Sequence, residues 1–390
     1  MSWIRRIASF PRRHEQAAAA AEPAATDDER VLAASQWQLM WWKFRRHRLA
    51  LISGFVVLLL YLVAVLVEFI APYDPDLQDT RHAYQPPTAI HFVDNAGQFH
   101  LRPFIYGTTR QRDLGTLTLV FAEDRSKVYP IRLFVRGKPY RLFGVIATDR
   151  HLFGVDSEEE KVFLVGADRQ GRDMFSRVIY GTRISMSVGL VGVALSFVLG
   201  ILIGGISGYY GGTLDTIIQR VIEFLRAMPT IPLWMSLSAA LPPNWPPLRV
   251  YFAITIILSL IGWTGLARVV RGRFLALREE DFVMAARLSG SSKMRIILRH
   301  MVPSFASHII AALTLAVPEM ILSETSLSFL GLGLRYPAIS WGVLLQEAQN
   351  IRSVATAPWL LVPGVAVVIA VLALNFLGDG LRDAADPYGR

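Results

Sequence analysis

The sequence predicts an all-α polytopic membrane protein with six transmembrane helices and a small β-rich insertion between the first two. The chain of 390 residues is 53% hydrophobic, more than soluble domains usually contain. Several almost uncharged runs approach or exceed the ~20 residues that a helix needs to cross a bilayer. The bases behind the net charge of +9 cluster beside these runs, as in a membrane protein's cytoplasmic loops. We therefore expect these bases to contact membrane lipids, and we expect no nucleic-acid partner.

The N-terminal part of the chain predicts a tail, an interfacial helix and the first span. Residues 1–36 contain a run of Ala and Glu, and we expect a disordered cytoplasmic tail. Residues 37–72 begin with tryptophans interleaved with bases, which suits a short helix in the headgroup layer. Leu49–Val67 is uncharged and predicts the first span, and the bases ahead of it place the N-terminus in the cytoplasm.

Residues 73–180 form a long polar segment, which we expect on the periplasmic side. Within it, residues 89–162 predict a small β-rich domain. The Asn-Ala-Gly sequence at 95–97 separates two strand-like runs and predicts a hairpin turn. The Arg-Gly-Lys-Pro sequence at 136–139 predicts a second hairpin turn, and Thr116–Phe121 predicts a further strand.

Residues 181–390 contain the other five predicted spans, which together form the expected transmembrane core. These spans are predicted at Ile184–Leu214, Ile217–Leu241, Val250–Ala267, Phe305–Leu330 and Trp359–Leu377. Gly200, Gly204 and Gly208 recur every four residues, which places them on one helix face where another helix can approach closely. An even number of spans brings the C-terminus back to the cytoplasm.

Two of the six predicted spans carry charged residues: the third, Ile217–Leu241, and the fifth, Phe305–Leu330. Pro229 predicts a bend in the third span, where Glu223 and Arg226 are three residues apart and are expected to pair. Glu319 and Glu324 lie in the fifth span, and intramembrane acids usually face a bundle interior or a water-filled cavity. Both are therefore candidates for a translocation path. The alternative places Glu324 in solvent near the outer membrane interface.

The cytoplasmic loop 272–303 joins the fourth and fifth spans. Its second part, Asp281–Pro303, is charged yet helical in pattern, and we call it the elbow. Asp281 caps its expected first helix, Gly290 suits the left-handed residue that ends this helix, and Pro303 stops the second. The candidates for the cap of the second helix are Ser291 and Ser292. Ala285 and Ala286 are expected to leave a flat face against which a partner protein packs.

The chain lacks the motifs of several enzyme classes. It has no glycine-rich phosphate-binding loop, no HExxH motif and no zinc-ligand spacing, so we expect no catalytic, cofactor-binding or metal-binding residues. The absence of cysteine excludes disulfides and thiolate chemistry. The three histidines of the insertion match no metal motif and are expected to be ordinary surface or hydrogen-bonded residues.

The elbow resembles the Glu-Ala-Ala coupling loop of ABC-importer permeases. The positions that match this pattern are Ala285, Ala286, Gly290, Val302 and Pro303. Met284 stands where the pattern has Glu, and His300 stands where it has an apolar residue. Four further stretches, at 71–75, 163–185, 324–342 and 377–387, resemble the C-type permease subunit of oligopeptide and dipeptide ABC importers. The resemblance covers most of residues 37–88 and 163–390.

The resemblance implies a type I ABC-importer permease fold and a transport subunit without an ATPase site. Such a subunit passes a solute, here expected to be a peptide or peptide-like molecule, from a periplasmic binding protein to the cytoplasm. The implied partners are a homologous second permease, two ATP-binding subunits that hold ATP and Mg²⁺, and the periplasmic solute-binding protein. The implied location is the bacterial inner membrane, with both termini cytoplasmic. The residues implied in ATPase coupling are Met284, Ala285, Ala286, Arg287, Gly290 and Pro303.

Two other classes of function remain open from the sequence. A membrane-anchored receptor would use the β-rich insertion as a periplasmic sensor and the elbow as a docking site for a signalling protein. An intramembrane enzyme is disfavoured because the chain has no recognisable catalytic set.

Overall fold

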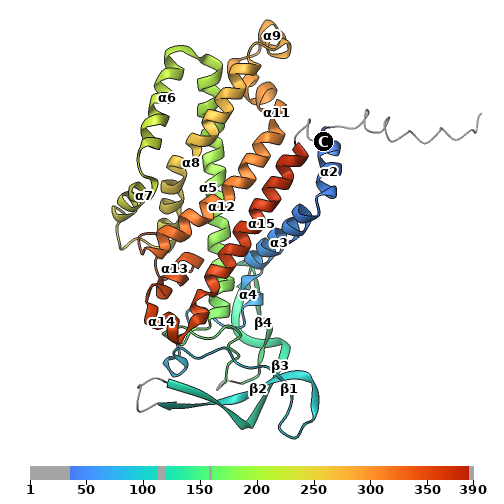
Figure 1. The fold of residues 1–390 in the computed structure, drawn as a ribbon, viewed down its shortest axis with the longest axis vertical. Helices are drawn as coiled ribbons and strands as arrows, with labels where there is room; N and C mark the ends of the chain where they lie inside the picture. Colours follow the sequence, from blue (N-terminus) through green and yellow to red (C-terminus); the bar gives the residue numbers. More distant parts are fainter. Residues whose placement is uncertain (1–35, 113–118, 158–159, 386–390) are drawn as a thin grey trace, which may run out of the picture.

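A computed structural model describes residues 36–112, 119–157 and 160–385 of the chain. Long helices lie side by side in a bundle, with a β sheet at one end and the short helix α9 at the other (Figure 1). Five helices in this described part are long and apolar enough to cross a membrane. They cover Arg48–Val65, Met174–Tyr210, Pro247–Leu277, Ile309–Phe329 and Pro358–Ala385. The predicted tail lies outside the described residues except Gln36, which begins a helix.

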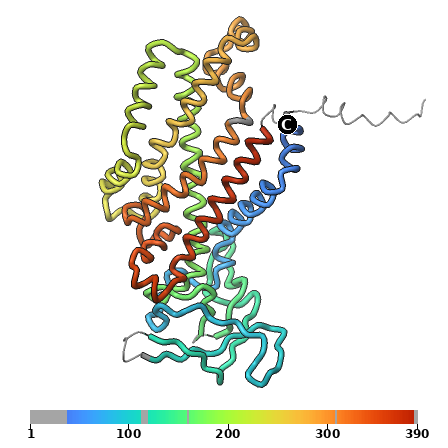
Figure 2. The backbone as a smooth tube through the Cα atoms, in the orientation of Figure 1, coloured from blue at the N-terminus to red at the C-terminus, as the bar shows by residue number. Residues whose placement is uncertain are grey.

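The expected interfacial helix and first span are separate helices. Helix α2 covers Gln36–Arg46, α3 covers Arg48–Val65 and the short α4 covers Val67–Ile70. Between α2 and α3, His47 accepts a hydrogen bond at its Nδ1 from the Ala50 backbone N–H at 3.0 Å, which caps α3. The backbone tube in Figure 2 shows α3 and the C-terminal helix running side by side.

The insertion folds as a four-stranded antiparallel sheet with strand order β1-β2-β3-β4. The strands are β1 His91–Val93, β2 Phe99–Arg112, β3 Leu119–Leu142 and β4 Ile146–Val155, preceded by the 3₁₀ helix η1, Thr80–His82. The first predicted hairpin is confirmed, because residues 95–97 lie between β1 and β2. Of the strand expected at 116–121, residues 119–121 begin β3, and residues 113–118 lie outside the described part.

The second predicted hairpin turn was wrong. Residues 136–139 lie within β3, where Arg136 faces Arg150 and Tyr140 faces Thr148, so four residue steps oppose two and form a bulge. A Cβ at Gly137 would lie 2.5 Å from the His151 ring, so the glycine is used to admit this side chain. The actual turn is at 143–145, where Phe143 and Gly144 have φ of 54° and 73°.

The third expected span is divided into two helices. Helix α5 covers Met174–Tyr210, α6 covers Gly212–Ala227, α7 covers Thr230–Ala239 and α8 covers Pro247–Leu277. Met228 is extended between α6 and α7, because a residue that precedes proline is disfavoured in the helical region. Gly211 and Gly212 both have positive φ and make the turn after α5.

The remaining helices follow in order around the elbow and the last spans. They are α9 Asp281–Leu288, α10 Lys293–Arg295, the π-helix η2 Ile296–Met301, α11 Val302–Ser304, α12 Ala306–Phe329, α13 Trp341–Leu345, η3 Gln346–Gln349, α14 Ile351–Thr356, η4 Pro358–Leu361 and α15 Val362–Ala385. The main core lies among α5, α8, α12 and α15. A Cβ at Gly204 would lie 2.4 Å from the Ala267 carbonyl oxygen, which confirms the close packing predicted for this glycine face.

Candidate functional site

The elbow is a helix, a left-handed glycine and a second helical segment. Gly290 has φ of 75°, and its N–H bonds the Arg287 carbonyl at 3.0 Å while the Ser291 N–H bonds the Ala286 carbonyl at 3.1 Å. This pattern satisfies the free carbonyls at the end of α9. Glu280 occupies the N-cap position, so Asp281 is the first residue inside α9 and not its cap.

The second helical segment does not stop at Pro303, as the sequence predicted. It runs from Lys293 through η2 into α11, and it ends at Phe305, whose φ is −129°. Proline has no N–H, and η2, a π-helix, occupies the turn immediately before α11. Ser292 is the N-cap residue of this segment, which selects one of the two predicted candidates.

The two alanines of the elbow differ in burial. Ala286 is buried with Val283 in a cluster that includes Phe274 and Ile297 of the same chain. Ala285 is exposed. The expectation that both alanines face a partner is therefore wrong for Ala286, because α9 is amphipathic and uses this side chain for its own packing.

The exposed side of the elbow carries large apolar side chains among bases such as Lys293 and Arg295. Its exposed large apolar side chains are Phe282, Met284, Leu288, Met294 and Leu298. Leu288, the last residue of α9, is 87% exposed. Such a cluster on a short helix is typical of a protein interaction surface.

Aromatic contacts join the elbow to the end of α5. The Arg287 guanidinium lies 5.1 Å from the centroid of the Tyr209 ring, and Lys293 Nζ lies 4.7 Å from that of Tyr210. These are cation–π distances. Close by, the Asp215 carboxylate of α6 accepts two hydrogen bonds from Arg271 of α8, each 2.6 Å long. The sequence reasoning did not identify the two tyrosines, although an aromatic pair at a helix end beside a basic segment was visible.

A cavity of about 260 Å³ lies among α5, α6, α7, α8 and α12, and we call it the bundle cavity. Its polar lining residues are Ser196, Arg226, Thr230, Trp234, Thr264, Glu319 and Ser323. A second hollow of about 320 Å³ shares Trp234, Glu319 and Ser323 with it and extends to Asn375 of α15. Glu319 thus lies between two hollows, one of which carries the guanidinium of Arg226.

Arg226 does not pair with Glu223, contrary to the prediction. Glu223 instead pairs with Arg220 at 2.8 Å, on the exposed side of α6. Among the described residues no ion pair involves Arg226 or Glu319. The Trp234 indole N–H is also buried without a hydrogen-bond partner in the described structure. One cation, one anion and one free donor therefore line the same space.

Glu324 lies in a closed cage of hydroxyl groups. Its carboxylate accepts hydrogen bonds from Ser328 at 2.7 Å, Ser340 at 2.8 Å and Ser185 at 3.5 Å. The side chain is fully buried, so it is not solvated at an interface, which was one of the two expectations. These bonds tie α5, α12 and the N-terminus of α13 together, because buried carboxylates require partners.

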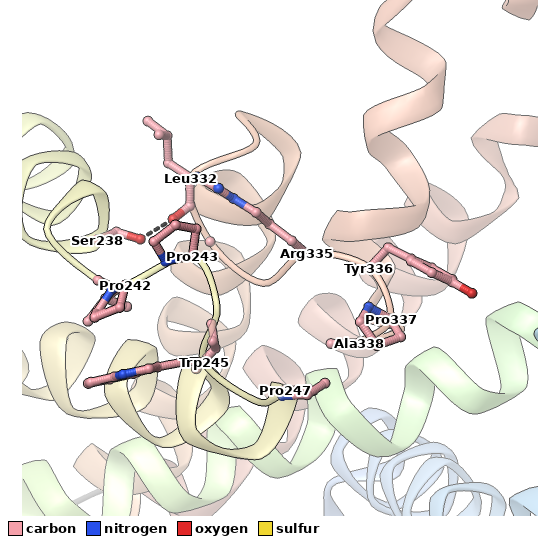
Figure 3. A pocket seen from close by; sticks show the side chains of 13 residues that line it. Ser238, Pro242, Pro243, Trp245, Pro247, Leu332, Arg335, Tyr336, Pro337 and Ala338 are labelled. Carbon is pink, nitrogen blue, oxygen red and sulfur yellow. Dashed lines mark hydrogen bonds between the residues drawn. The ribbon is translucent and has the colours of Figure 1, made fainter.

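A pocket of about 80 Å³ lies between the α7–α8 connection and the segment after α12, and we call it the loop pocket. Pro242 and Trp245 line it from one side, and Arg335 and Tyr336 line it from the other (Figure 3). Ser238 donates a hydrogen bond to the Leu332 carbonyl across it. This hydrogen bond therefore joins the two loops that line the pocket.

The segment before α5 holds a buried network of charges. The Asp168 carboxylate accepts hydrogen bonds from the Arg172 side chain at 2.7 Å and backbone N–H at 3.0 Å, and it pairs with Arg177 at 3.2 Å. Asp173 caps α5 by accepting the Ser176 backbone N–H at 2.8 Å. Burial raises the pKa of Asp173 to about 6, and the bonds from Ser176 offset only part of this effect.

Comparisons with known proteins identify the family. Residues 200–388 match the model of the binding-protein-dependent transport system inner membrane component, and residues 35–87 match the N-terminal domain of oligopeptide transport permease C. The sheet lies between the two matches.

Similar proteins are known in several bacteria. The chain is 37% identical over 224 residues to a Bacillus subtilis dipeptide transport system permease, covering 57% of this chain and 68% of that protein. It is 38% identical over 244 residues to a Haemophilus influenzae oligopeptide transport system permease, covering 62% and 76%. A MetNI methionine ABC transporter chain aligns at 18% identity with a TM-score of 0.43, covering 55% and 98%. The chain belongs to the family of binding-protein-dependent transport system inner membrane components.

Proposed function

We propose that this chain is a permease subunit of an ATP-driven importer that carries peptides from a periplasmic binding protein into the cytoplasm. The observation that carries the proposal is the elbow, which exposes large apolar side chains while Val283 and Ala286 anchor it to the bundle. The identities to dipeptide and oligopeptide permeases support the choice of solute. The partners would be a homologous second permease, two ATPase subunits that bind ATP and Mg²⁺, and the binding protein.

The proposed topology places the elbow and both termini in the cytoplasm and the sheet in the periplasm of a bacterial inner membrane. The sheet and α9 lie at opposite ends of the bundle, which supports this arrangement (Figure 1). Helices α6 and α7 together form the third of six spans in this proposal, because the chain must return across the membrane between α5 and α8.

Coupling would proceed through contacts at both faces of the elbow. The ATPases would bind the exposed side, with Met284 and Ala285 nearest to them. Arg287 and Lys293 would pass the displacement to the tyrosines at the end of α5, and Gly290 and Pro303 would fix the shape of the segment. Binding that differs between two positions of the elbow shifts the population of those positions.

The solute path would pass along the bundle cavity. A peptide with free termini carries an ammonium group and a carboxylate, which Glu319 and Arg226 can bind as hydrogen-bonded ion pairs. The Trp234 N–H can donate to a peptide carbonyl. Glu324, enclosed by hydroxyl groups, would support the wall of the path by holding α5 and α12 together.

The two alanines of the elbow offer a matched test of coupling. We expect Ala285→Asp to keep the melting temperature of the importer but to lower ATPase activity stimulated by loaded binding protein about tenfold, because the charge faces the ATPase. We expect Ala286→Asp to lower stability by several kcal/mol, because its carboxylate would be buried without a partner. Normal stimulation and uptake in Ala285→Asp would contradict the coupling role.

Charge-neutral variants test the path in reconstituted vesicles. We expect Glu319→Gln and Arg226→Gln to lower the rate of tripeptide uptake at subsaturating peptide about tenfold, the effect of losing ~1.4 kcal/mol of ion-pair stabilisation. Glu223→Gln is the matched control, since this acid pairs with Arg220 on the exposed side of α6. Acetylating the peptide amine should remove the defect of Glu319→Gln relative to the parent. Equal uptake by all three variants would exclude the bundle cavity from the path.

A further inference from the structure

The hairpin tip between β3 and β4 is apolar and exposed. Phe143 is 57% exposed, Val145 is 81% exposed and Ile146 is 56% exposed. Gly144 lies between the first two, and Leu142 precedes them. The tip thus presents a compact group of large apolar side chains that its own sheet does not cover. An exposed apolar cluster of this kind marks a contact surface.

The turn chemistry at this tip is unusual for a hairpin in water. Phe143 has φ of 54° and Gly144 has φ of 73°. Hairpin turns with two positive φ values favour Asn-Gly or Asp-Gly, because short polar side chains tolerate the left-handed region. A bulky residue there is an outlier that costs about 1–3 kcal/mol. The chain therefore keeps a phenylalanine where backbone conformation alone favours a polar residue.

The hairpin lies beside the end of the first membrane-spanning helix. The Phe134 ring of β3 lies 6.1 Å from the Phe69 ring of α4, and His151 Nδ1 of β4 lies 2.7 Å from the Ala71 carbonyl oxygen. Tyr140, nearer the tip, is close enough to Glu68 for that carboxylate to help raise the pKa of its phenol, after the larger effect of burial. Because α3 ends at Val65, the strands pass the very end of a span (Figure 1).

Bases surround the apolar tip. Arg136, Lys138, Arg141 and Arg150 lie on the two strands within a few residues of it. Lys138 pairs with Asp74 at 2.5 Å, whereas Arg141 is exposed and has no ion pair among the described residues. Apolar side chains followed by bases along one element match the order of acyl chains and phosphates in a membrane interface.

We propose that the tip, Leu142–Ile146, inserts into the membrane interface and anchors the sheet to the lipid surface, with Arg141 on lipid phosphates. This proposed contact of the tip with lipid does not depend on which side of the membrane the sheet occupies. It also lies outside the family matches, because the sheet falls between residues 87 and 200. The occupant of this apolar surface is lipid, because the two strands that carry the tip pack against α4, which directly follows the apolar spanning helix α3.

A site-specific fluorescent probe tests this insertion. The chain has no cysteine, so Val145→Cys can be labelled with an NBD fluorophore in the full-length chain. Ala96→Cys is the matched control, at the tip of the β1–β2 hairpin. Both proteins are reconstituted into phosphatidylcholine–phosphatidylglycerol vesicles with or without lipids that carry a nitroxide near the headgroup.

We expect the probe at 145 to emit at shorter wavelength than the probe at 96 and to lose at least half of its intensity to lipid nitroxides. We expect aqueous iodide to quench the probe at 96 several-fold more than the probe at 145. Equal iodide quenching at both positions would place the tip in water and overturn the proposal. A short-wavelength emission at 145 that lipid nitroxides leave unchanged would assign the tip to a protein contact, which also overturns it.

Discussion

The two ends of α5 are held by different kinds of interaction. At its N-terminus, Asp168 and Asp173 hold the chain through short hydrogen bonds in a buried network. At its C-terminus, Tyr209 and Tyr210 meet the elbow through cation–π contacts at 5.1 and 4.7 Å. Asp168 and Asp173 are buried, whereas Arg287 is half-buried and Lys293 is exposed, so water screens the second set of contacts more than the first. Asp215 and Arg271 also form short hydrogen bonds near the C-terminus of α5, so we expect only the contacts of Arg287 and Lys293 with the tyrosines to change readily.

Two left-handed glycines show the same contrast. Gly171, before α5, has φ of 71°, and a Cβ there would lie 1.8 Å from the Asp79 carbonyl oxygen. Gly290, in the elbow, has φ of 75°, and a Cβ there would meet no atom within 4 Å. An alanine would suffer similar backbone strain at both positions, because both have positive φ. Only at position 171 would its methyl group also collide with a neighbouring atom.

The largest effect is expected from Gly171→Ala. The methyl group cannot fit against the backbone of residue 79, so we expect no monodisperse protein after detergent extraction. Gly290→Ala should lose only the ~1–2 kcal/mol of a left-handed alanine and should remain folded by size-exclusion chromatography. Equal yields and equal melting temperatures for the two variants would break the comparison.

A smaller loss is expected from Asp168→Asn. This change leaves two buried arginines without their carboxylate, and breaking a buried ion pair costs about 3–5 kcal/mol. The exposed pair of Arg220 and Glu223 supplies the control, since Glu223→Gln should cost less than ~1 kcal/mol. Thermal melting in detergent measures both, and a mild Asp168→Asn variant would show that the sheet end is not fixed by its charges.

The smallest effect is a pH dependence from Asp173. Its pKa in the fold is raised to about 6, whereas an unfolded Asp titrates near ~3.9. Between pH ~4 and about 6, the folded state therefore holds a proton that the unfolded state has released. The contribution of Asp173 to the free energy of unfolding is fully present below pH ~4 and is lost as pH rises through about 6. The loss is on the order of 3 kcal/mol before any screening by solvent. Asp173→Asn keeps a capping oxygen but cannot titrate, so its melting temperature should fall less than that of the parent between pH 4 and 8.

The helical part of the fold was predictable because its signals are local. Long apolar runs beside bases define the helices, and the Asn-Ala-Gly turn defines the first hairpin. The second hairpin was misplaced because Arg-Gly-Lys-Pro has turn composition, yet Gly137 serves a contact with His151. That histidine bonds the carbonyl of Ala71, 80 residues away. No local pattern contains this information.

The candidate site was predictable where a residue contradicts its surroundings. Glu319 was identified because it is an acid in an apolar run. Arg226 was assigned the wrong role because Glu223 has a base three residues away on either side, and spacing cannot choose between them. Trp234 carried no signal at all, since an aromatic residue is ordinary in an apolar helix and only packing shows that its N–H has no partner.

The length of α5 gives this contrast a mechanical consequence. Its 37 residues extend about 55 Å, nearly twice the ~30 Å of hydrocarbon that it must cross. Gly204 and Gly208 bring it into close contact with α8, so under the proposed coupling we expect the two helices to move together. A tilt of about 5° around the N-terminus of α5 would swing the far end through about 5 Å, close to one helical turn. A small rotation at the sheet end would therefore produce a displacement of about one helical turn at the elbow.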